Sequence, residues 1–440
     1  MEMFCHGYQS WSESAWRTIG VDEDPSRAPG AIPLVIDMHS GDPTPAASGE
    51  LRSELITALR ADRDDPPVVT GGQGTLRFVD GELVGGDRTY ETLELWASEI
   101  GQANNARVTA PYQVGWCSWY HYFDRVTEAD VRANLALASD WPFDVFQIDD
   151  GYQAAIGDWL QTNDKFPSTL AELAASIAAE GRRPGIWLAP FLAAPSSEVA
   201  QLHPDWFATH ASGRRLIAAV NEHWGGAVHA LDTTNPEVLD HIEGVARSLV
   251  ETGFTYLKLD FTYAPGLTGH FADPSRTSAE RVHAGFEAAR RGAGDDTFLL
   301  GCGAPLGPAI GLVDGMRIGP DVAPWWELPD DRAYPPGYRA TSPATANALR
   351  ATKARQFMHR RLWLNDPDCV MLRTSHTDLT EELVREWALA VGESGGMVLV
   401  SDDLALLGAS ERSLLTDVIA RGREVDDQRI GSTSARTNVR

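Results

Sequence analysis

Two aspartates at the ends of strand-like segments are the residues best suited to chemistry. Asp260 ends the run YLKLD, and Asp321 ends the run MRIGPD. Each has a cation upstream on its own segment, Lys258 in the first and Arg317 in the second. Two carboxyl groups at the ends of different strands are what cleavage of a glycosidic bond requires, one as nucleophile or base and the other as acid.

The alternation within the first run places Tyr256, Lys258 and Asp260 on one face of the strand. Burying charge is costly unless the charge is paired, so this face predicts a polar pocket. The alternative is that Asp260 or Asp321 only caps the turn or helix that follows its strand, as aspartate often does. Two such aspartates, each with its own cation, favour the pocket.

Composition narrows the class of protein. The 440 residues include 43% hydrophobic side chains and carry a net charge of −25, which argues against nucleic acid or an anionic membrane as partner. The stretch Met1 to Arg17 lacks a signal-peptide pattern and no run reaches membrane-spanning length, so we expect a soluble cytoplasmic protein, or one whose export signal is absent from this chain. The spacings of the cysteines and histidines match no metal site, so we expect no metal.

The elements that position the two aspartates follow from the pattern of strands and helices. Residues 1–108 read as β-structure and loop, with a hairpin predicted from residues 75–79 and 82–84 around Asp80-Gly81, and residues 22–67 fit no element. From about residue 112, short apolar strands alternate with helical stretches. The eight predicted strands are 114–119, 145–149, 185–189, 255–260, 298–302, 315–318, 361–364 and 397–401.

Eight such units predict an α/β fold, a (β/α)8 TIM barrel over residues 109–420, preceded by a partial N-terminal β-sandwich-like segment over 1–108. A polar C-terminal tail that reads as disordered is expected over 421–440. The rival, a doubly wound sheet, lacks the expected G-x-G-x-x-G after its first strand.

In a barrel, the carboxyl ends of the strands share one mouth. Carboxylates, cations and indoles gathered there suit a neutral polyhydroxylated ligand, since carboxylates accept bonds from hydroxyls and an indole stacks on a sugar ring. The alternatives are an ordinary turn for Asp149-Asp150, a core position for Trp187, and a turn for the NDPD sequence at 365–368, which is a site candidate only second. The residues expected at the mouth are Trp119, Tyr120, Asp149, Asp150, Trp187, Lys258, Asp260, Cys302, Arg317 and Asp321.

From about Asn104 to Leu406 the chain resembles glycoside hydrolase family 36, the retaining α-galactosidases of the GH-D clan. The resemblance rests on an ordered series of motifs, each weak alone: GWCSWYHYF, FDVFQIDDGY, PGIWLAPF, KLDF, DGMRIGPDVAP and LWLNDPDC. An earlier segment, GYQSW at residues 7–11, is similar to one that the family's N-terminal β domain contributes.

The resemblance implies residue roles and no cofactor. Asp260 would be the nucleophile and Asp321 the general acid/base of a hydrolase that releases terminal α-D-galactose from melibiose- or raffinose-type oligosaccharides. Asp149 and Asp150 would bind galactose hydroxyls. The remaining implied contacts are Lys258 and Arg317 to ring hydroxyls, Trp119, Tyr120, Trp187 and Cys302 in the pocket lining, and Trp11 at its rim.

Departures from the family pattern lie at the two ends: only six residues precede Gly7, and the chain stops soon after the eighth predicted strand. Either the sequence is a fragment or mis-started, or a partner covers the cut. Half a sandwich exposes strand edges that a partner could cover, so an oligomer is possible. Within the same chemistry, a raffinose-type galactosyltransferase or an α-N-acetylgalactosaminidase is the alternative. A non-catalytic sugar-binding barrel is the alternative of another class. The sequence distinguishes neither the preferred galactoside nor the balance between hydrolysis and transglycosylation.

Overall fold

The structure is a computed structural model of the chain. The residues it describes are 2–5, 9–18, 68–71, 74–79, 82–84, 90–329 and 341–437. The first two residues of the GYQSW segment, the Asp80-Gly81 turn and the unassigned stretch 22–67 lie outside them.

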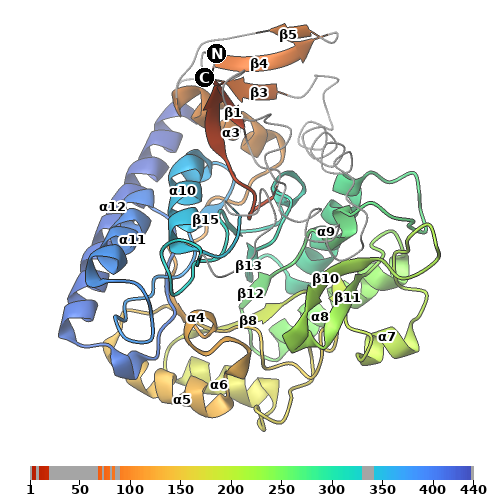
Figure 1. The fold of residues 1–440 in the computed structure, drawn as a ribbon, viewed down its shortest axis with the longest axis horizontal. Coiled ribbons are helices and arrows are strands. Elements are labelled where there is room, and N and C mark those ends of the chain that lie inside the picture. The colour runs from red at the N-terminus through yellow and green to blue at the C-terminus, as the bar shows by residue number, and fades with distance from the viewer. Residues whose placement is uncertain are drawn as a thin grey trace.

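An eight-stranded parallel sheet forms the centre of the molecule (Figure 1). Its strands follow one another in chain order around a (β/α)8 barrel, which confirms the predicted fold class. The seventh predicted strand, 361–364, is displaced along the chain. Arg360 takes a turn conformation with φ 59°, and the strand begins only at Leu364. The strands are β6 (Val114–Cys117), β7 (Val145–Ile148), β8 (Arg183–Leu188), β12 (Tyr256–Leu259), β13 (Phe298–Gly301), β14 (Gly315–Arg317), β15 (Leu364–Asp366) and β16 (Val398–Val400).

The barrel closes between its first and last strands. β16 pairs with β6 in parallel, and on its other side the Met397 N–H donates to the Asn365 carbonyl at 2.9 Å. Gly396 makes this approach possible, because a Cβ at that position would lie 2.9 Å from the Asn365 oxygen. Closure brings the carboxyl ends of all eight strands to one mouth.

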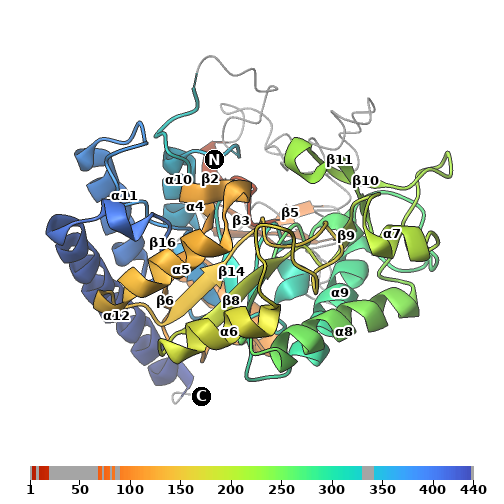
Figure 2. The same cartoon turned by 90° about the horizontal axis from the view of Figure 1, so that it is seen from below.

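Helices surround the barrel (Figure 2). Three of them begin with a threonine whose hydroxyl accepts from the N3 amide while an acidic N3 side chain reaches back, a capping box that fixes where each helix starts. The helices are α3 (Tyr90–Ala103), α4 (Trp119–Tyr122), α5 (Glu128–Leu137), α6 (Leu170–Ala179), α7 (Glu198–Leu202), α8 (Pro236–Glu251), α9 (Ser278–Ala293), α10 (Thr345–Arg355), α11 (Glu381–Ser394) and α12 (Ala409–Thr437).

The C-terminal segment differs from the expected disordered tail. α12 continues through residue 421 to Thr437. Although its composition is polar, the helix is attached to the barrel by a buried side chain. Asp426 is buried and accepts from Arg360 Nε and from His359 Nε2, both at 2.7 Å. Paired buried charge stabilises a helix that its composition alone does not predict.

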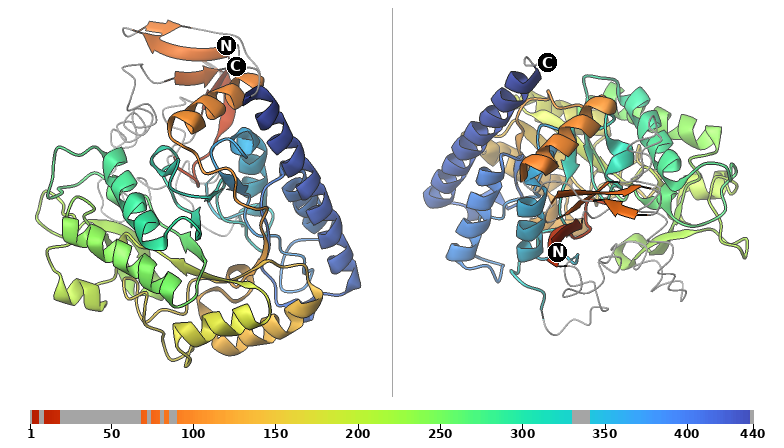
Figure 3. Two further views of the ribbon diagram at one scale, coloured as in Figure 1. Left: turned by 180° about the vertical axis from the view of Figure 1, so that it is seen from behind. Right: turned by 90° about the horizontal axis from the view of Figure 1, so that it is seen from above.

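A five-stranded antiparallel sheet precedes the barrel and lies at one end of the molecule beside α3 (Figures 1 and 3). The pairing of β4 with β5 confirms the predicted hairpin. The division into domains at residues 108 and 420 stays a prediction. In sheet order the strands are β2 (Ala15–Thr18), β1 (Glu2–Cys5), β3 (Val68–Gly71), β4 (Gly74–Val79) and β5 (Glu82–Val84).

A small antiparallel sheet between β8 and α8 was not predicted. It consists of β9 (Leu192–Ala193), β10 (Ile217–Asn221) and β11 (Gly226–Ala230), with β10 and β11 joined by a tight hairpin (Figure 2). Among the described residues, none of the helices is both long and apolar enough to cross a membrane.

Candidate active site

A cavity opens at the mouth of the barrel, where the carboxyl ends of β6, β7, β8, β12 and β14 converge. Including its open side, it encloses about 370 Å³, at the small end of the range for ligand pockets and suited to one sugar ring. Its lining combines four carboxyl groups with one ammonium group, one amide and five aromatic side chains. The lining residues are Trp11, Trp119, Asp149, Asp150, Trp187, Asn221, Trp224, Lys258, Asp260, Phe261 and Asp321.

Asp260 is held in one orientation at the end of β12. Its backbone N–H donates to the Leu188 carbonyl at 2.8 Å, which continues the strand ladder by one residue. Its Oδ2 accepts from Trp187 Nε1 at 3.0 Å and its Oδ1 from the Phe261 amide at 2.7 Å. These two donors, one on each oxygen, fix the orientation of the carboxyl group.

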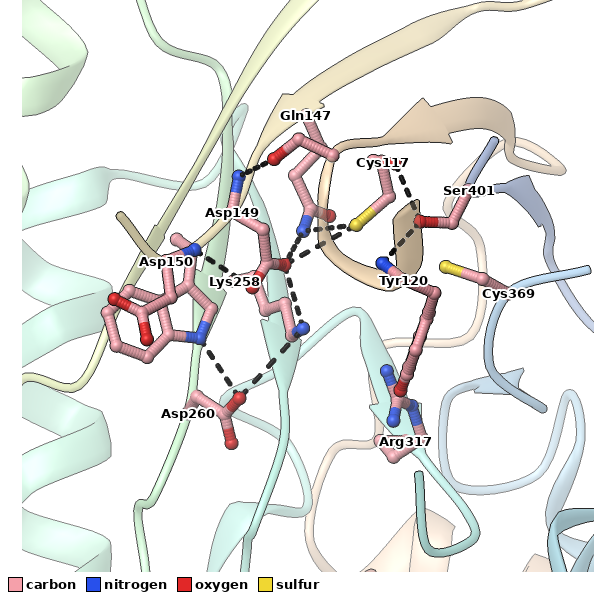
Figure 4. A network of polar contacts seen from close by, with 12 residues as sticks. Cys117, Tyr120, Gln147, Asp149, Asp150, Lys258, Asp260, Arg317, Cys369 and Ser401 are labelled. Atoms are coloured by element: carbon pink, nitrogen blue, oxygen red, sulfur yellow. Dashed lines mark hydrogen bonds and ion pairs between the residues drawn. The ribbon is translucent and has the colours of Figure 1, made fainter. Parts of the chain in front are cut away.

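Lys258 connects two carboxylates across the barrel floor (Figure 4). Its ammonium lies 2.9 Å from Asp149 Oδ2 and 3.9 Å from Asp260 Oδ2. Burial alone would lower the pKa of Lys258, but the attraction of Asp149 and then of Asp260 raises it well above its ordinary value. The lysine is therefore a permanent cation between the two acids.

Asp149 and Asp150 follow β7 and differ in their partners. Asp149 Oδ2 accepts from Lys258 and from Gln147 Nε2, the latter at 2.5 Å. Among the described residues, the side-chain donors to Asp150 are neutral: Gln153 Nε2 at 2.6 Å and Trp224 Nε1 at 2.8 Å. Burial raises the pKa of Asp150 to about 6, and the two hydrogen bonds only partly offset that rise. Both acids can accept hydrogen bonds from ligand hydroxyls in the cavity.

Asp321 follows β14 and pairs with Arg317 from the same strand, Nη1 to Oδ1 at 2.9 Å. Although 32% of its side chain is exposed, reduced hydration in the cavity raises the pKa of Asp321; the charge of Arg317 opposes the rise and that of Asp260 adds to it. A carboxyl group that keeps its proton to higher pH than an ordinary aspartate suits an acid catalyst.

Eight of the eleven residues predicted for the site line the cavity, and the other three lie behind the lining. Tyr120 is buried, and its hydroxyl donates to Asp368. Cys302 is buried after β13, where loss of hydration raises the pKa of its thiol well above the usual range. Arg317 is 2% exposed and reaches the cavity only through Asp321.

Sequence reasoning missed Asn221, Trp224 and Phe261. The first two come from the β10–β11 hairpin, whose turn uses Gly225 and Gly226 at φ 82° and 109°. That glycine pair after an apolar run is the signal that could have indicated a hairpin, although nothing in it places the turn at the mouth. Phe261 contacts the Trp224 ring at a centroid distance of 4.9 Å, and so completes the aromatic wall.

Trp11 reaches the cavity because the N-terminal segment is tied to the barrel. The Ser10 amide donates to the Ala304 carbonyl at 2.8 Å, and the indole packs edge-on to Phe261 at 5.2 Å. Gly303, at φ 54°, allows this approach, since a Cβ there would lie 3.0 Å from the Trp11 ring.

Arg355 holds the N-terminal segment, residues 9–12, by hydrogen bonds to its backbone. It is fully buried and donates to three of the segment's carbonyls: Nη1 to Ser10 at 2.6 Å, and Nη2 to Gln9 and Ser12 at 3.0 and 2.8 Å. A planar guanidinium has five N–H donors in a fixed fork whereas a lysine ammonium has three, so arginine can serve more acceptors here.

Comparison with known proteins agrees with this geometry. Residues 110–285 match the Melibiase family. Two curated relatives are α-galactosidase AgaA of Geobacillus stearothermophilus, 29% identical over 37% of this chain and 22% of its own length, and α-galactosidase of Escherichia coli, 30% identical over 22% and 14%. The aligned region thus spans less than a quarter of either relative.

Solved structures match over more of the chain. TtGalA, an α-galactosidase from Thermus thermophilus in complex with p-nitrophenyl α-D-galactopyranoside, superposes with a TM-score of 0.74 and 31% identity over 96% of this chain and 86% of its own. The crystal structure of the GH36 α-galactosidase AgaA superposes with a TM-score of 0.57 and 16% identity, over 78% of this chain and 46% of its own. At that identity, the likeness shows the fold alone.

Proposed function

Because the chain belongs to the melibiase family, the α-galactosidases of glycoside hydrolase family 36, we propose that it hydrolyses terminal, non-reducing α-D-galactose from galacto-oligosaccharides of the melibiose and raffinose type, with retention of configuration. The observation that carries the proposal is the shared cavity of Asp260 and Asp321, one a fixed acceptor of two hydrogen bonds and the other with a raised pKa.

In the first step, a carboxylate oxygen of Asp260 forms a bond to the anomeric carbon while the bond to the departing oxygen breaks. Asp321 gives its proton to that oxygen, so the leaving group departs as a neutral alcohol. The bond from Trp187 Nε1 and the charge of Lys258 keep Asp260 oriented and ionised for attack.

In the second step, the now ionised Asp321 takes a proton from water, whose oxygen attacks the anomeric carbon and displaces Asp260. Two displacements at one carbon return the α configuration, and both carboxyl groups regain their starting protonation states. Arg317 at 2.9 Å stabilises the ionised Asp321 that exists between the two steps.

Recognition of the galactose ring follows from the rest of the lining. Asp149 and Asp150 supply oxygens that accept from hydroxyls, and the indoles of Trp11, Trp119 and Trp187 supply apolar surface for the ring's carbon face. The Thermus α-galactosidase is known in complex with p-nitrophenyl α-D-galactopyranoside and with stachyose, and these are the first substrates to try.

Hydrolysis of p-nitrophenyl α-galactoside by wild type, Asp260→Ala and Asp232→Ala tests the proposal. Asp232 is a buried carboxylate outside the lining, held by the amides of Ala272 and Thr234, so it controls for simple loss of a buried acid. We expect kcat to fall by about 10³-fold or more in Asp260→Ala alone. We also expect proton NMR to show α-galactose as the first product of the wild-type protein. Unimpaired turnover by Asp260→Ala, or β-galactose as first product, would contradict the mechanism.

A further inference from the structure

Behind Asp321 lies a buried cluster of Arg317, Asp366 and Asp368, of which the two-step mechanism uses only Arg317. Arg317 donates from all three guanidinium nitrogens: Nη1 to Asp321 at 2.9 Å, Nη2 to Asp368 at 2.7 Å and Nε to Asp366 at 3.3 Å. Asp366 ends β15 and Asp368 follows it, both within the NDPD sequence that resembles an ordinary turn. One cation thus faces three carboxyl groups, and only Asp321 lines the cavity.

Asp368 receives four donors on its two oxygens. Its Oδ1 accepts from Arg317 Nη2 and from the Cys369 amide, both at 2.7 Å. Its Oδ2 accepts from the Tyr120 hydroxyl and from the Val322 amide, the latter at 2.8 Å. Tyr120 and Arg317 approach each other from α4 and β14 (Figure 4). An amide in place of this carboxylate could accept at only one of the two positions.

Two of those four bonds lead to the proposed acid/base. Val322 is the next residue after Asp321, so the bond from its amide fixes the backbone that carries Asp321. Arg317 is the cation paired with the Asp321 carboxyl. Asp368 is therefore linked to Asp321 in two ways, through the backbone at Val322 and through Arg317, which pairs with both carboxyl groups.

The backbone of Asp368 adds an independent observation. Its φ is 94°, in the left-handed region that favours glycine, and its own amide donates to Asp366 Oδ1 at 2.9 Å. A non-glycine residue persists in such a conformation only where surrounding contacts fix it, and such residues concentrate at functional sites. Asp368 has no exposed surface, so a role in solubility or surface binding is excluded.

We propose that Asp368 is a positioning residue for Asp321, acting through the Arg317 guanidinium and the Val322 amide. The inference rests on the proposed function, since it assigns Asp368 to the proton transfer that Asp321 carries out. Misplacing a proton donor by about 1 Å costs on the order of 10²-fold in rate. That loss should appear only where the leaving group needs the proton.

Charge in the cluster supports a role in proton transfer. Burial raises the pKa of Asp368 to about 7, the charge of Arg317 opposes the rise, and the charges of Asp321 and Asp366 add to it. Asp368→Asn replaces one of the carboxyl groups that pair with Arg317 by a neutral amide. Arg317 can then pair more fully with Asp321, which lowers the pKa of Asp321. The alkaline limb of kcat/KM should then move to lower pH.

The test compares Asp368→Asn with Asp314→Asn on two substrates, melibiose and 2,4-dinitrophenyl α-galactoside. Asp314 is a matched control at the opposite end of β14: it is buried, pairs with Arg290 at 2.6 Å and accepts from the Leu299 amide at 2.9 Å, but lies away from the cavity. If Asp368→Asn does not fold, Asp366→Ala, which removes the acceptor of the Asp368 amide and of Arg317 Nε, serves in its place.

For Asp368→Asn we expect kcat/KM to fall by about 10²-fold on melibiose and by less than about 5-fold on the dinitrophenyl substrate, whose leaving group needs no proton. Asp314→Asn should lower both equally or neither. Equal losses on the two substrates by Asp368→Asn, with an unmoved alkaline limb, would leave only a structural role and overturn the proposal. Failure of Asp321→Asn to show the same substrate dependence would instead overturn the proposed function.

Discussion

Lys258 forms its shorter ion pair with Asp149, 2.9 Å away at the end of β7, across the intervening strand β8. Asp260, on its own strand, lies farther at 3.9 Å. The lysine thus contacts both the carboxylate proposed to bind the sugar and the proposed nucleophile. We therefore expect binding and attack to be coupled through this buried cation, whose position follows from the alternation of β12 and the closure of the barrel.

Removal of this cation should impair both functions. Lys258→Met leaves two buried carboxylates without their shared counter-ion, so we expect a loss of about 10²-fold or more in kcat/KM. Lys165→Met, which removes a lysine whose contact is the Asp124 carbonyl, is the control. A kcat/KM of Lys258→Met that matches wild type would refute the coupling.

Asp150 should make folding stability depend on pH. Its pKa rises from 3.8 to about 6 in the folded protein, so the folded state holds the proton more tightly. Its contribution to stability is present below about pH 4 and is lost as pH rises through 6, at about 1.4 kcal/mol per pH unit. Urea unfolding of Asp150→Asn at several pH values should lack this decline. An unchanged slope between pH 4 and 6 would show that Asp150 is not its source.

The hairpin tryptophan should matter for binding. Trp224→Phe keeps a ring against Phe261 but removes the donor to Asp150, so KM for an α-galactoside should rise about 10-fold with a smaller change in kcat. Trp206→Phe is a matched control, because Trp206 Nε1 donates to Glu237 at 3.0 Å outside the lining. Equal KM values for the two variants would argue against a role for the hairpin in the site.

Arg355 and Trp11 should behave as one unit. Arg355→Lys offers three donors in place of the five bonds that the guanidinium makes to the carbonyls of residues 9, 10, 12 and 318 and to the Ser14 hydroxyl. We therefore expect residues 9–12, and Trp11 with them, to be held less firmly at the rim. We expect Arg355→Lys and Trp11→Ala each to raise KM, and the double variant to be no worse than the stronger single variant. Additive effects in this double-mutant cycle would mean that Arg355 supports the site by another route.

The parts of the fold that sequence predicts best are those with a strong repeating pattern. Several barrel strands are short apolar runs that end in a polar group, and that pattern places Asp149, Lys258, Asp260 and Asp321 at one mouth. The α12 helix was missed because its stabilisation comes from Asp426 meeting Arg360 and His359, residues distant in sequence.

The rim was predicted least. Trp224 lies in a short hairpin outside the barrel repeat, so its spacing carries no information about the mouth. Asp368 follows a strand but sits in a sequence typical of turns, and only the convergence of four donors distinguishes it from a turn residue. Such long-range contacts depend on tertiary structure, which local patterns do not encode.

The most direct test of the central proposal is mass mapping of the protein after brief reaction with 5-fluoro-α-D-galactosyl fluoride, which slows breakdown of a covalent intermediate. A galactosyl label on the peptide that contains Asp260, absent from Asp260→Ala, is the predicted result. A label on Asp321, or full turnover of the reagent by Asp260→Ala, would contradict the assignment of Asp260 as nucleophile.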